Sequence, residues 1–237
     1  MRSNLGGTSD ADAPRGIRIG NVGTASNGRA IDLEISNTSA YHAYNPQLNG
    51  VRQRTGGGFG VINLLAAGWS SGIESTAVQL RYTFVDAVTS APVRIGRTHM
   101  TFYDLDGSPL LTECIQARGT GGWALIEDSE LHVRNASSWV HGLAAWESAT
   151  FCSSVVGSGG DNPTDPRSLT ELQRSRSVLY TLEGVSSFEV RLLLEGCCGT
   201  GRNFLFAGFS SVLPSFCALP PPSHPPRPMH PPLPPAS

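Results

Sequence analysis

Residues 78–84 read VQLRYTF, and this stretch decides the fold. Apolar side chains stand at every second position and polar ones stand between them: Val78, Leu80, Tyr82 and Phe84 alternate with Gln79, Arg81 and Thr83. Successive side chains of a β-strand point to opposite faces of its sheet, so the alternation predicts a strand with one buried face.

The same period of two recurs along the chain. Further strands are predicted at residues 31–35, 59–64, 93–102, 111–115, 123–127, 131–133, 146–156, 178–182, 188–194 and 204–209. A helical pattern is predicted near residues 166–174, where Asp165 would cap the first turn, Pro166 would occupy its first position, and Leu169 and Leu172 would share one face. The fold class predicted is all-β, an antiparallel β-sandwich of jelly-roll-like type.

Composition favours the same class and excludes some partners. The chain has 237 residues with 27 glycines and only 15% charged residues, which suits short strands joined by tight turns better than a helical bundle. The net charge is −2, and the 17 cationic side chains, all arginines, are spread along the chain. Without a basic block to follow phosphates, nucleic acid is not an expected partner. No apolar run is long enough to predict a membrane span.

Three segments are expected. Residues 1–15 form a flexible N-terminal segment, residues 16–218 the β-sandwich domain, and residues 219–237 a disordered proline-rich tail. The polar start lacks the apolar segment of a signal peptide. A secreted form would therefore have lost that peptide, or the sequence is a fragment of a longer chain.

The cysteines predict disulfides and no zinc site. They are Cys114, Cys152, Cys197, Cys198 and Cys217, and no CxxC pair occurs among them. In an oxidising compartment two bridges would form, with one cysteine left over. The preferred pairing joins one of Cys197 and Cys198 to Cys217, and the other to Cys152 or Cys114. Free buried thiols in a cytosolic protein are the alternative.

Acidic turns make calcium a candidate cofactor. Asp104 and Asp106 lie two positions apart where a strand ends, and Asp161 and Asp165 lie in a later loop. Calcium takes six to eight oxygen ligands, which turns supply as carboxylates and carbonyls. Additional oxygens would come from Asp86, Glu113 and Asn162. The alternative is turn chemistry alone, because Asp and Gly favour turns.

Aromatic residues in or near loops make carbohydrate a second candidate ligand. Tyr41, Tyr44, Trp69 and Trp123 form the predicted platform, on which a sugar ring would stack its C–H face. The alternative is that these rings fill the core. Residues 68–72 match the GxSxG pattern of serine hydrolases, but a strand follows instead of a helix, so no catalytic residue is assigned.

Two segments resemble known extracellular proteins. The strings LRYTFVD at 80–86, PV at 92–93 and TFYDLDG at 101–107 resemble β-sandwich modules of large secreted or surface proteins of bacteria and algae. There, an aromatic strand is followed by a second strand that ends on an Asp-x-Asp turn. The proline-rich end is similar to algal extracellular-matrix proteins. The resemblance implies an adhesive or matrix role without catalysis.

The sequence therefore predicts a non-catalytic extracellular or cell-surface binding module, with a glycan or an extracellular protein as its partner. One alternative is a purely structural module of a larger extracellular protein. The other is a hydrolase that acts on glycans, with a carboxylate pair as acid and base.

Overall fold

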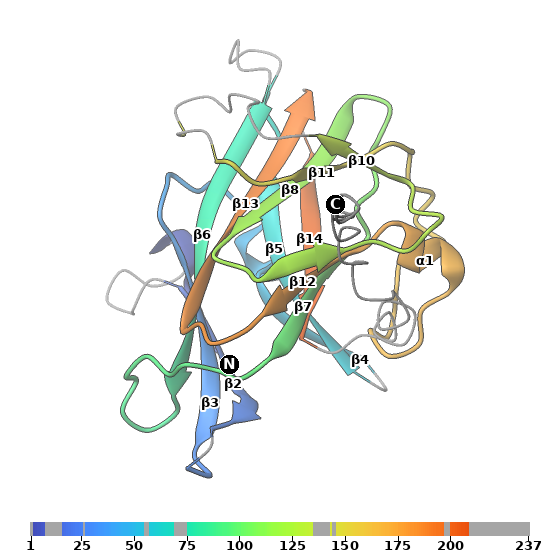
Figure 1. The fold of residues 1–237 in the computed structure, drawn as a ribbon. Helices are drawn as coiled ribbons and strands as arrows, with labels where there is room; N and C mark the ends of the chain where they lie inside the picture. Colours follow the sequence, from blue (N-terminus) through green and yellow to red (C-terminus); the bar gives the residue numbers. More distant parts are fainter. Residues whose placement is uncertain are drawn as a thin grey trace, which may run out of the picture.

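The computed structural model describes residues 2–7, 16–25, 27–54, 57–68, 75–134, 143, 146–196 and 200–208. Within these residues the chain forms two antiparallel sheets that face one another (Figure 1). The first sheet has the order β1 (Arg2–Ser3), β2 (Ile17–Thr24), β3 (Ala30–Asn37), β6 (Ser75–Asp86), β13 (Ser187–Gly196), β8 (Leu111–Arg118), β11 (Thr150–Ser153) and β10 (Leu131–Arg134). The second has the order β4 (Gly50–Arg54), β5 (Gly57–Leu65), β14 (Gly201–Ala207), β7 (Thr98–Tyr103), β12 (Val178–Leu182) and β9 (Gly122–Ala124). The predicted all-β sandwich is confirmed.

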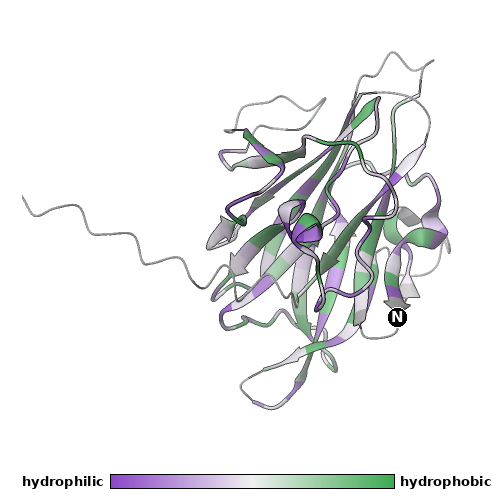
Figure 2. Cartoon of the chain, turned by 90° about the vertical axis from the view of Figure 1, so that its right-hand side faces the viewer, coloured by the Kyte–Doolittle hydropathy of each residue, from purple (hydrophilic) through white to green (hydrophobic). Residues whose placement is uncertain are grey.

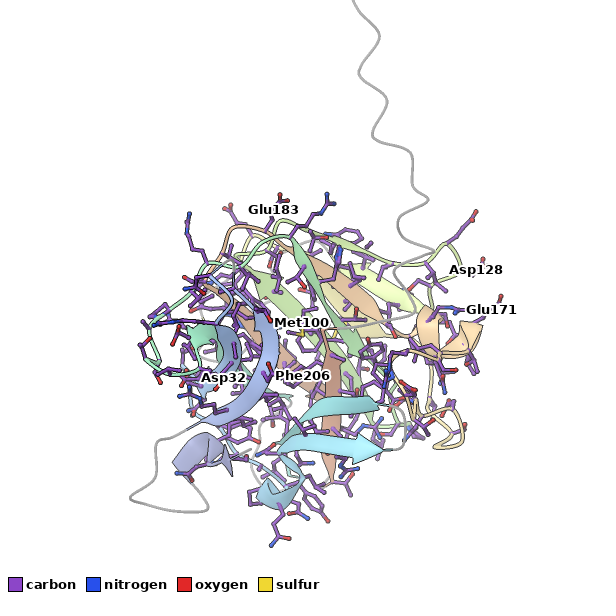
Figure 3. All side chains as sticks on the ribbon, turned by 90° about the horizontal axis from the view of Figure 1, so that it is seen from below. Asp32, Met100, Asp128, Glu171, Glu183 and Phe206 are labelled. Atoms are coloured by element: carbon purple, nitrogen blue, oxygen red, sulfur yellow. A yellow bond between two sulfur atoms is a disulfide. The ribbon has the colours of Figure 1, made fainter. Side chains whose placement is uncertain are left out.

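The core lies between the sheets and follows the period of two. Each inner strand sends alternate residues inward, such as Val78, Leu80, Tyr82 and Phe84 of β6, and Phe188, Val190, Leu192 and Leu194 of β13. Hydrophobic and hydrophilic residues alternate along the strands accordingly (Figure 2). Met100 and Phe206 lie in the interior, whereas Glu183, Asp128 and Glu171 lie on the outside (Figure 3). At about 25 cal/mol per Å² of apolar surface, this burial is the main force that holds the sheets together.

Several elements differ from the prediction in position. The predicted strand at 93–102 begins only at Thr98, and the one at 146–156 is confined to Thr150–Ser153. Strands β2 and β4 were not predicted. Residues 2–7, expected to be flexible, contain β1 and a 3-10 turn (Leu5–Gly7), and Leu5 is buried in the core. The proline-rich tail lies outside the described residues.

The helix is shorter than predicted and begins later. α1 spans Glu171–Ser175, and its N-cap is Thr170, not Asp165. The Thr170 hydroxyl accepts from the Gln173 backbone N–H at 3.2 Å, and the Gln173 side chain accepts from the Thr170 N–H at 3.0 Å. This reciprocal capping box satisfies two backbone donors at once. Asp165 instead accepts from the Arg167 backbone N–H at 2.9 Å and closes a turn. A second short 3-10 turn spans Pro46–Leu48.

No helix in the described part of the chain is long and apolar enough to cross a membrane.

A buried tyrosine gives a first testable prediction. Tyr82 is fully buried against Phe188, with ring centroids 4.9 Å apart, and its hydroxyl has no hydrogen-bond partner among the described residues. A buried polar group without a partner costs about 1 kcal/mol or more. Tyr82→Phe is therefore expected to raise the free energy of unfolding by about 1 kcal/mol in a denaturant titration.

The matched control is Tyr41→Phe. The Tyr41 hydroxyl is also buried, but it donates to the Asn63 carbonyl at 2.5 Å and accepts from Asn49 Nδ2 at 2.8 Å. This variant is expected to lose about 1–2 kcal/mol, because both partners are left unsatisfied. Equal losses in the two variants would contradict the prediction.

Candidate binding pocket

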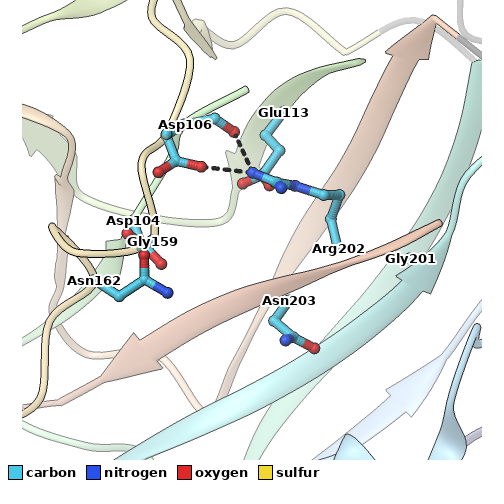
Figure 4. A pocket seen from close by; sticks show the side chains of 9 residues that line it. Asp104, Asp106, Glu113, Gly159, Asn162, Gly201, Arg202 and Asn203 are labelled. Atoms are coloured by element: carbon cyan, nitrogen blue, oxygen red, sulfur yellow. Dashed lines mark hydrogen bonds and ion pairs between the residues drawn. The ribbon is translucent and has the colours of Figure 1, made fainter. Parts of the chain in front are cut away.

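A polar pocket lies at one end of the sandwich, where several chain segments meet (Figure 4). Two of its acids follow β7, one comes from β8, and the start of β14 and a loop at 157–162 supply the rest. Its volume is about 160 Å³, and it is lined by Asp104, Asp106, Glu113, Gly157, Gly159, Asn162, Gly201, Arg202 and Asn203. These residues are called the Asp104 pocket below.

Backbone contacts fix the two loops of the pocket against each other. The Gly107 N–H donates to the Val155 carbonyl at 2.8 Å, and the Gly157 N–H donates to the Gly107 carbonyl at 2.9 Å. A Cβ atom at position 157 would lie 2.0 Å from Oδ2 of Asp106. Glycine is therefore required at 157 for the loop to approach the carboxylate this closely.

Arg202 connects the two sheets at the base of the pocket. The alternation along β14 places it on the same face as Phe204 and Phe206, which lie in the core between the sheets. Its Nε donates to Glu113 Oε1, and its Nη2 donates to Asp106 Oδ1 at 2.5 Å (Figure 4). Glu113 is only 1% exposed. The guanidinium thus neutralises Glu113 on the opposite sheet and Asp106 in the loop after β7, as buried carboxylates require.

A second buried arginine joins the loops behind the pocket. Arg176 donates from Nε to Glu130 Oε2 at 2.7 Å and from Nη1 to Asp161. The same Nη1 lies 3.8 Å from Oδ2 of Asp106. Arg176 is 8% exposed, so these contacts are largely shielded from solvent.

The carboxyl groups outnumber the guanidinium groups, and their pKa values reflect it. Burial, together with the charges of Asp106 and Asp161, raises the pKa of Asp104 to about 7. Burial likewise raises the pKa of Asp106, and it raises that of Glu113 well above the usual range, although Arg202 opposes both shifts. Perturbed acids in a pocket are typical of functional sites.

Some carboxyl oxygens of the pocket still lack a partner among the described residues. Oε2 of Glu113 is buried and has no hydrogen-bond partner in the described structure. No donor among the described residues is found for the Asp104 carboxylate either, and Asp104 has a left-handed backbone with φ of 59°. Aspartate tolerates this conformation better than most residues, but the strain still costs energy and is common at binding sites. The pocket therefore offers acceptors that the protein itself leaves unused.

An exposed tyrosine stands beside the pocket. Tyr44 is 55% exposed, and a Cβ atom added to Gly201 would lie 2.2 Å from its Cβ. The glycine at the start of β14 therefore makes room for Tyr44 next to a residue that lines the pocket. Tyr44 thus contacts one of the residues that line the pocket, although it does not line the pocket itself.

The structure does not bring the predicted aromatic platform together. Tyr41 is buried at 7% exposure and holds Asn49 and Asn63, so its assignment to an exposed platform was wrong. Trp123 is 48% exposed but lies on edge strand β9, and β12 and β7 separate it from β14. Trp69 lies outside the described residues, as does Ser70 of the GxSxG pattern. Of the three members of the platform that the structure describes, only Tyr44 contacts a residue that lines the pocket.

The structure brings the predicted calcium ligands together in part. Asp104, Asp106 and Asp161 belong to one electrostatic cluster, whereas Asp165 pairs with Arg167 in its own turn. Within the described part of the chain, the only acidic, histidine or cysteine side-chain atoms that converge in threes within 4.8 Å are those of Cys114, Cys152 and Glu195. The two sulfurs of that group form a disulfide, so it is not a metal site. Calcium binding remains a prediction.

The disulfide pairing differs from the preferred prediction. Cys114 on β8 and Cys152 on β11 stand directly opposite each other and form a disulfide. The pairing of either one with Cys197 or Cys198 was therefore wrong. Neighbouring strands explain the result, because cross-strand residues lie close enough to bridge. Cys197, Cys198 and Cys217 lie outside the described residues.

Few sequence signals indicated that these arginines would be buried. Arg202 stands in a glycine-rich segment. Only its spacing of two positions from Phe204, and of four from Phe206, indicated an inward side chain. Glu113 had the same signal, since it stands two positions from both Leu111 and Ile115 and therefore shares their face of the strand. Arg176 and Glu130 carried none. Trp146, an aromatic residue near a predicted loop, is buried against the guanidinium groups of Arg118 and Arg191, which lie 4.5 and 4.3 Å from its ring centroid.

A scan against protein-family models finds no match for this chain, and a search of the curated proteins finds no relative. The resemblance to surface modules of bacteria and algae is therefore not supported by a relative, and the argument for function depends on the pocket.

Proposed function

We propose that the chain is a non-catalytic extracellular or cell-surface module that binds carbohydrate in the Asp104 pocket. One observation carries the proposal: a pocket with unpaired carboxylate acceptors lies beside an exposed tyrosine. Sugar hydroxyls donate to carboxylates, and the C–H face of a sugar ring stacks on an aromatic ring. Small-ligand sites commonly combine a few polar groups with an aromatic surface.

Two further features support an extracellular setting and a binding role. The Cys114–Cys152 disulfide is of a kind that persists in oxidising compartments. The pocket is formed by loops and strand ends at one end of a rigid sandwich, which is where binding modules carry their sites.

The proposal is tested by titrating glycans into the full chain and its variants. Asp104→Asn removes a charged acceptor worth about 1.5–3 kcal/mol, so affinity is expected to fall tenfold or more. The fold should tolerate this change, because the Asp104 carboxylate has no partner among the described residues and its charge is disfavoured by burial. Asp165→Asn is the matched control, since that acid lies in a separate turn and does not line the pocket.

The tyrosine is tested in the same titrations. Tyr44→Ala is expected to weaken binding by about 1 kcal/mol or more, whereas Trp123→Ala removes an equally exposed ring from the edge of the sheet and should leave affinity unchanged. If no glycan binds the unaltered chain, the chain is better described as a structural module. If both aromatic variants bind as well as the original, the pocket is not the site.

A glycan hydrolase is the second candidate function, and one observation favours it. A carboxyl group whose pKa is raised to about 7 is suited to donate a proton to a leaving group near neutral pH. Hydrolysis of a bound oligosaccharide that is lost in Asp104→Asn would support this alternative. Binding without turnover supports the module.

A further inference from the structure

The Asp104 pocket contains more acidic side chains than its arginines can pair. Two guanidinium groups, Arg176 and Arg202, serve a cluster of acids: Asp104, Asp106, Glu113, Glu130 and Asp161. Arg202 faces Glu113 and Asp106, and Arg176 faces Glu130 and Asp161. Asp104 is left without a cation of its own. The excess of acids over arginines remains when every ion pair has been assigned.

A second observation, on hydrogen bonding instead of charge, also points into the pocket. Glu113 is buried at 1% exposure and lines the pocket, yet its Oε2 atom has no donor in the described structure. A buried carboxylate oxygen without a partner is costly in free energy. A group that enters the pocket with N–H donors and a positive charge would satisfy this oxygen and stabilise the ionised form of the unpaired acid.

An ammonium group fits this arrangement better than a bare divalent cation. Calcium requires six to eight oxygens at 2.3–2.6 Å, and no three carboxylates of the cluster converge within 4.8 Å in the described part of the chain. An ammonium group carries three donors and forms ion pairs with acceptors one or two at a time. Two separated carboxylates, Asp104 after β7 and Glu113 on β8, are sufficient for it.

We propose that the Asp104 pocket selects sugars that carry a free amine, with the ammonium group between the carboxylates of Asp104 and Glu113. This inference rests on the proposed carbohydrate site and specifies its ligand class. The ammonium group supplies the hydrogen-bond donor that Oε2 of Glu113 lacks, and the neighbouring ring of the sugar lies toward Tyr44. An N-acetylated sugar of the same size lacks the charge and brings an acetyl group instead.

The experiment compares matched oligosaccharides by calorimetry on the full chain. Glucosamine oligomers and N-acetylglucosamine oligomers of the same length differ only at the amine. The free-amine oligomers are expected to bind at least tenfold more tightly at pH 6.5. Asp104→Asn and Glu113→Gln should each reduce this ratio at least threefold, and Asp165→Asn should leave it unchanged. A thermal melt of Glu113→Gln checks that the fold survives the loss of its contact with Arg202, and Asp104→Asn tests the same ratio without breaking an ion pair.

Each outcome has a definite consequence. Equal or tighter binding of the acetylated oligomers overturns the inference but leaves the carbohydrate site in place. If neither oligomer nor any neutral glycan binds, the proposed function fails as well. Two further arms test other sources of positive charge: methylamine alone should bind weakly, and calcium alone should not bind. Calcium binding that is lost in Asp104→Asn would overturn the ammonium assignment in favour of a metal.

Discussion

Replacing Arg202 by methionine is expected to lower the free energy of unfolding by about 3–5 kcal/mol, because it leaves two buried carboxylates without their cation. Methionine retains much of the aliphatic length of arginine, so the loss is electrostatic and not a cavity. Glu113 is almost fully buried, and Asp106 is 4% exposed, so water cannot replace the guanidinium. Urea unfolding monitored by tryptophan fluorescence measures the change. Arg134→Met is the matched control, since the Arg134–Glu195 pair is exposed and should contribute less than about 1 kcal/mol.

The dependence on pH gives this prediction a definite sign. Burial raises the pKa of Glu113, so in the acid range the folded chain holds a proton that the unfolded chain releases. Stability from such a group is present below its unfolded pKa and is lost as the pH rises. Removing Arg202 raises the pKa further, so the loss in the variant should be larger at pH 8 than at pH 4.5. Adding Glu113→Gln to Arg202→Met should recover part of the loss at pH 8. A loss that is the same at both pH values would contradict the electrostatic explanation.

The sheets could be predicted from the sequence wherever one face of a strand is buried. In β12 the alternation of Val178, Tyr180 and Leu182 gave the strand with its correct bounds, because each of these side chains is in the core. The predicted strand at 93–102 failed at its start for the opposite reason. Val93 and Ile95 pack against the core from a loop, so their apolar character reflects burial and not strand pairing.

Edge strands could not be predicted in the same way. The second half of β2 is exposed on both faces, and its pairing with β3 is interrupted by a bulge between Ile19 and Gly23. Neither feature leaves a period of two in the sequence. Among the described residues β4 pairs only with β5, and it begins at a glycine, so its backbone pairing, and not its side chains, defines it.

The site could be predicted only on its acidic side. Asp104 and Asp106 stand in one turn, and Asp161 belongs to a loop that is rich in acids in the sequence. Their assignment to a common acidic site could therefore be predicted from the turn residues. The arginines were not, because whether Arg202 faces solvent or the core depends on the register of β14 with β5 and β7. A shift of one residue would turn Arg202 outward and leave Glu113 and Asp106 without its positive charge.

The disulfide between Cys114 and Cys152 is expected to contribute about 4 kcal/mol to the stability of the domain. It closes a segment of 38 residues, and a loop of that length loses about this much chain entropy in the unfolded state when it is bridged. Domains of this size are stable by only about 5–15 kcal/mol, so the loss is a large fraction of the total. The bridge joins β8 to β11, and β11 in turn carries edge strand β10, so reduction should loosen this side of the first sheet before the rest.

The measurement compares urea unfolding of the oxidised chain, the reduced chain, and the Cys114→Ala/Cys152→Ala variant. Reduction keeps both sulfur atoms in place and tests the cross-link alone, whereas the double variant also removes their packing against Leu193. The reduced chain should therefore lose about 4 kcal/mol, and the double variant slightly more. If reductant lowers the stability of the double variant as well, a second bridge among Cys197, Cys198 and Cys217 is responsible. If neither treatment changes the midpoint, the sulfurs contribute no cross-link, and the argument from this bridge for an oxidising compartment fails.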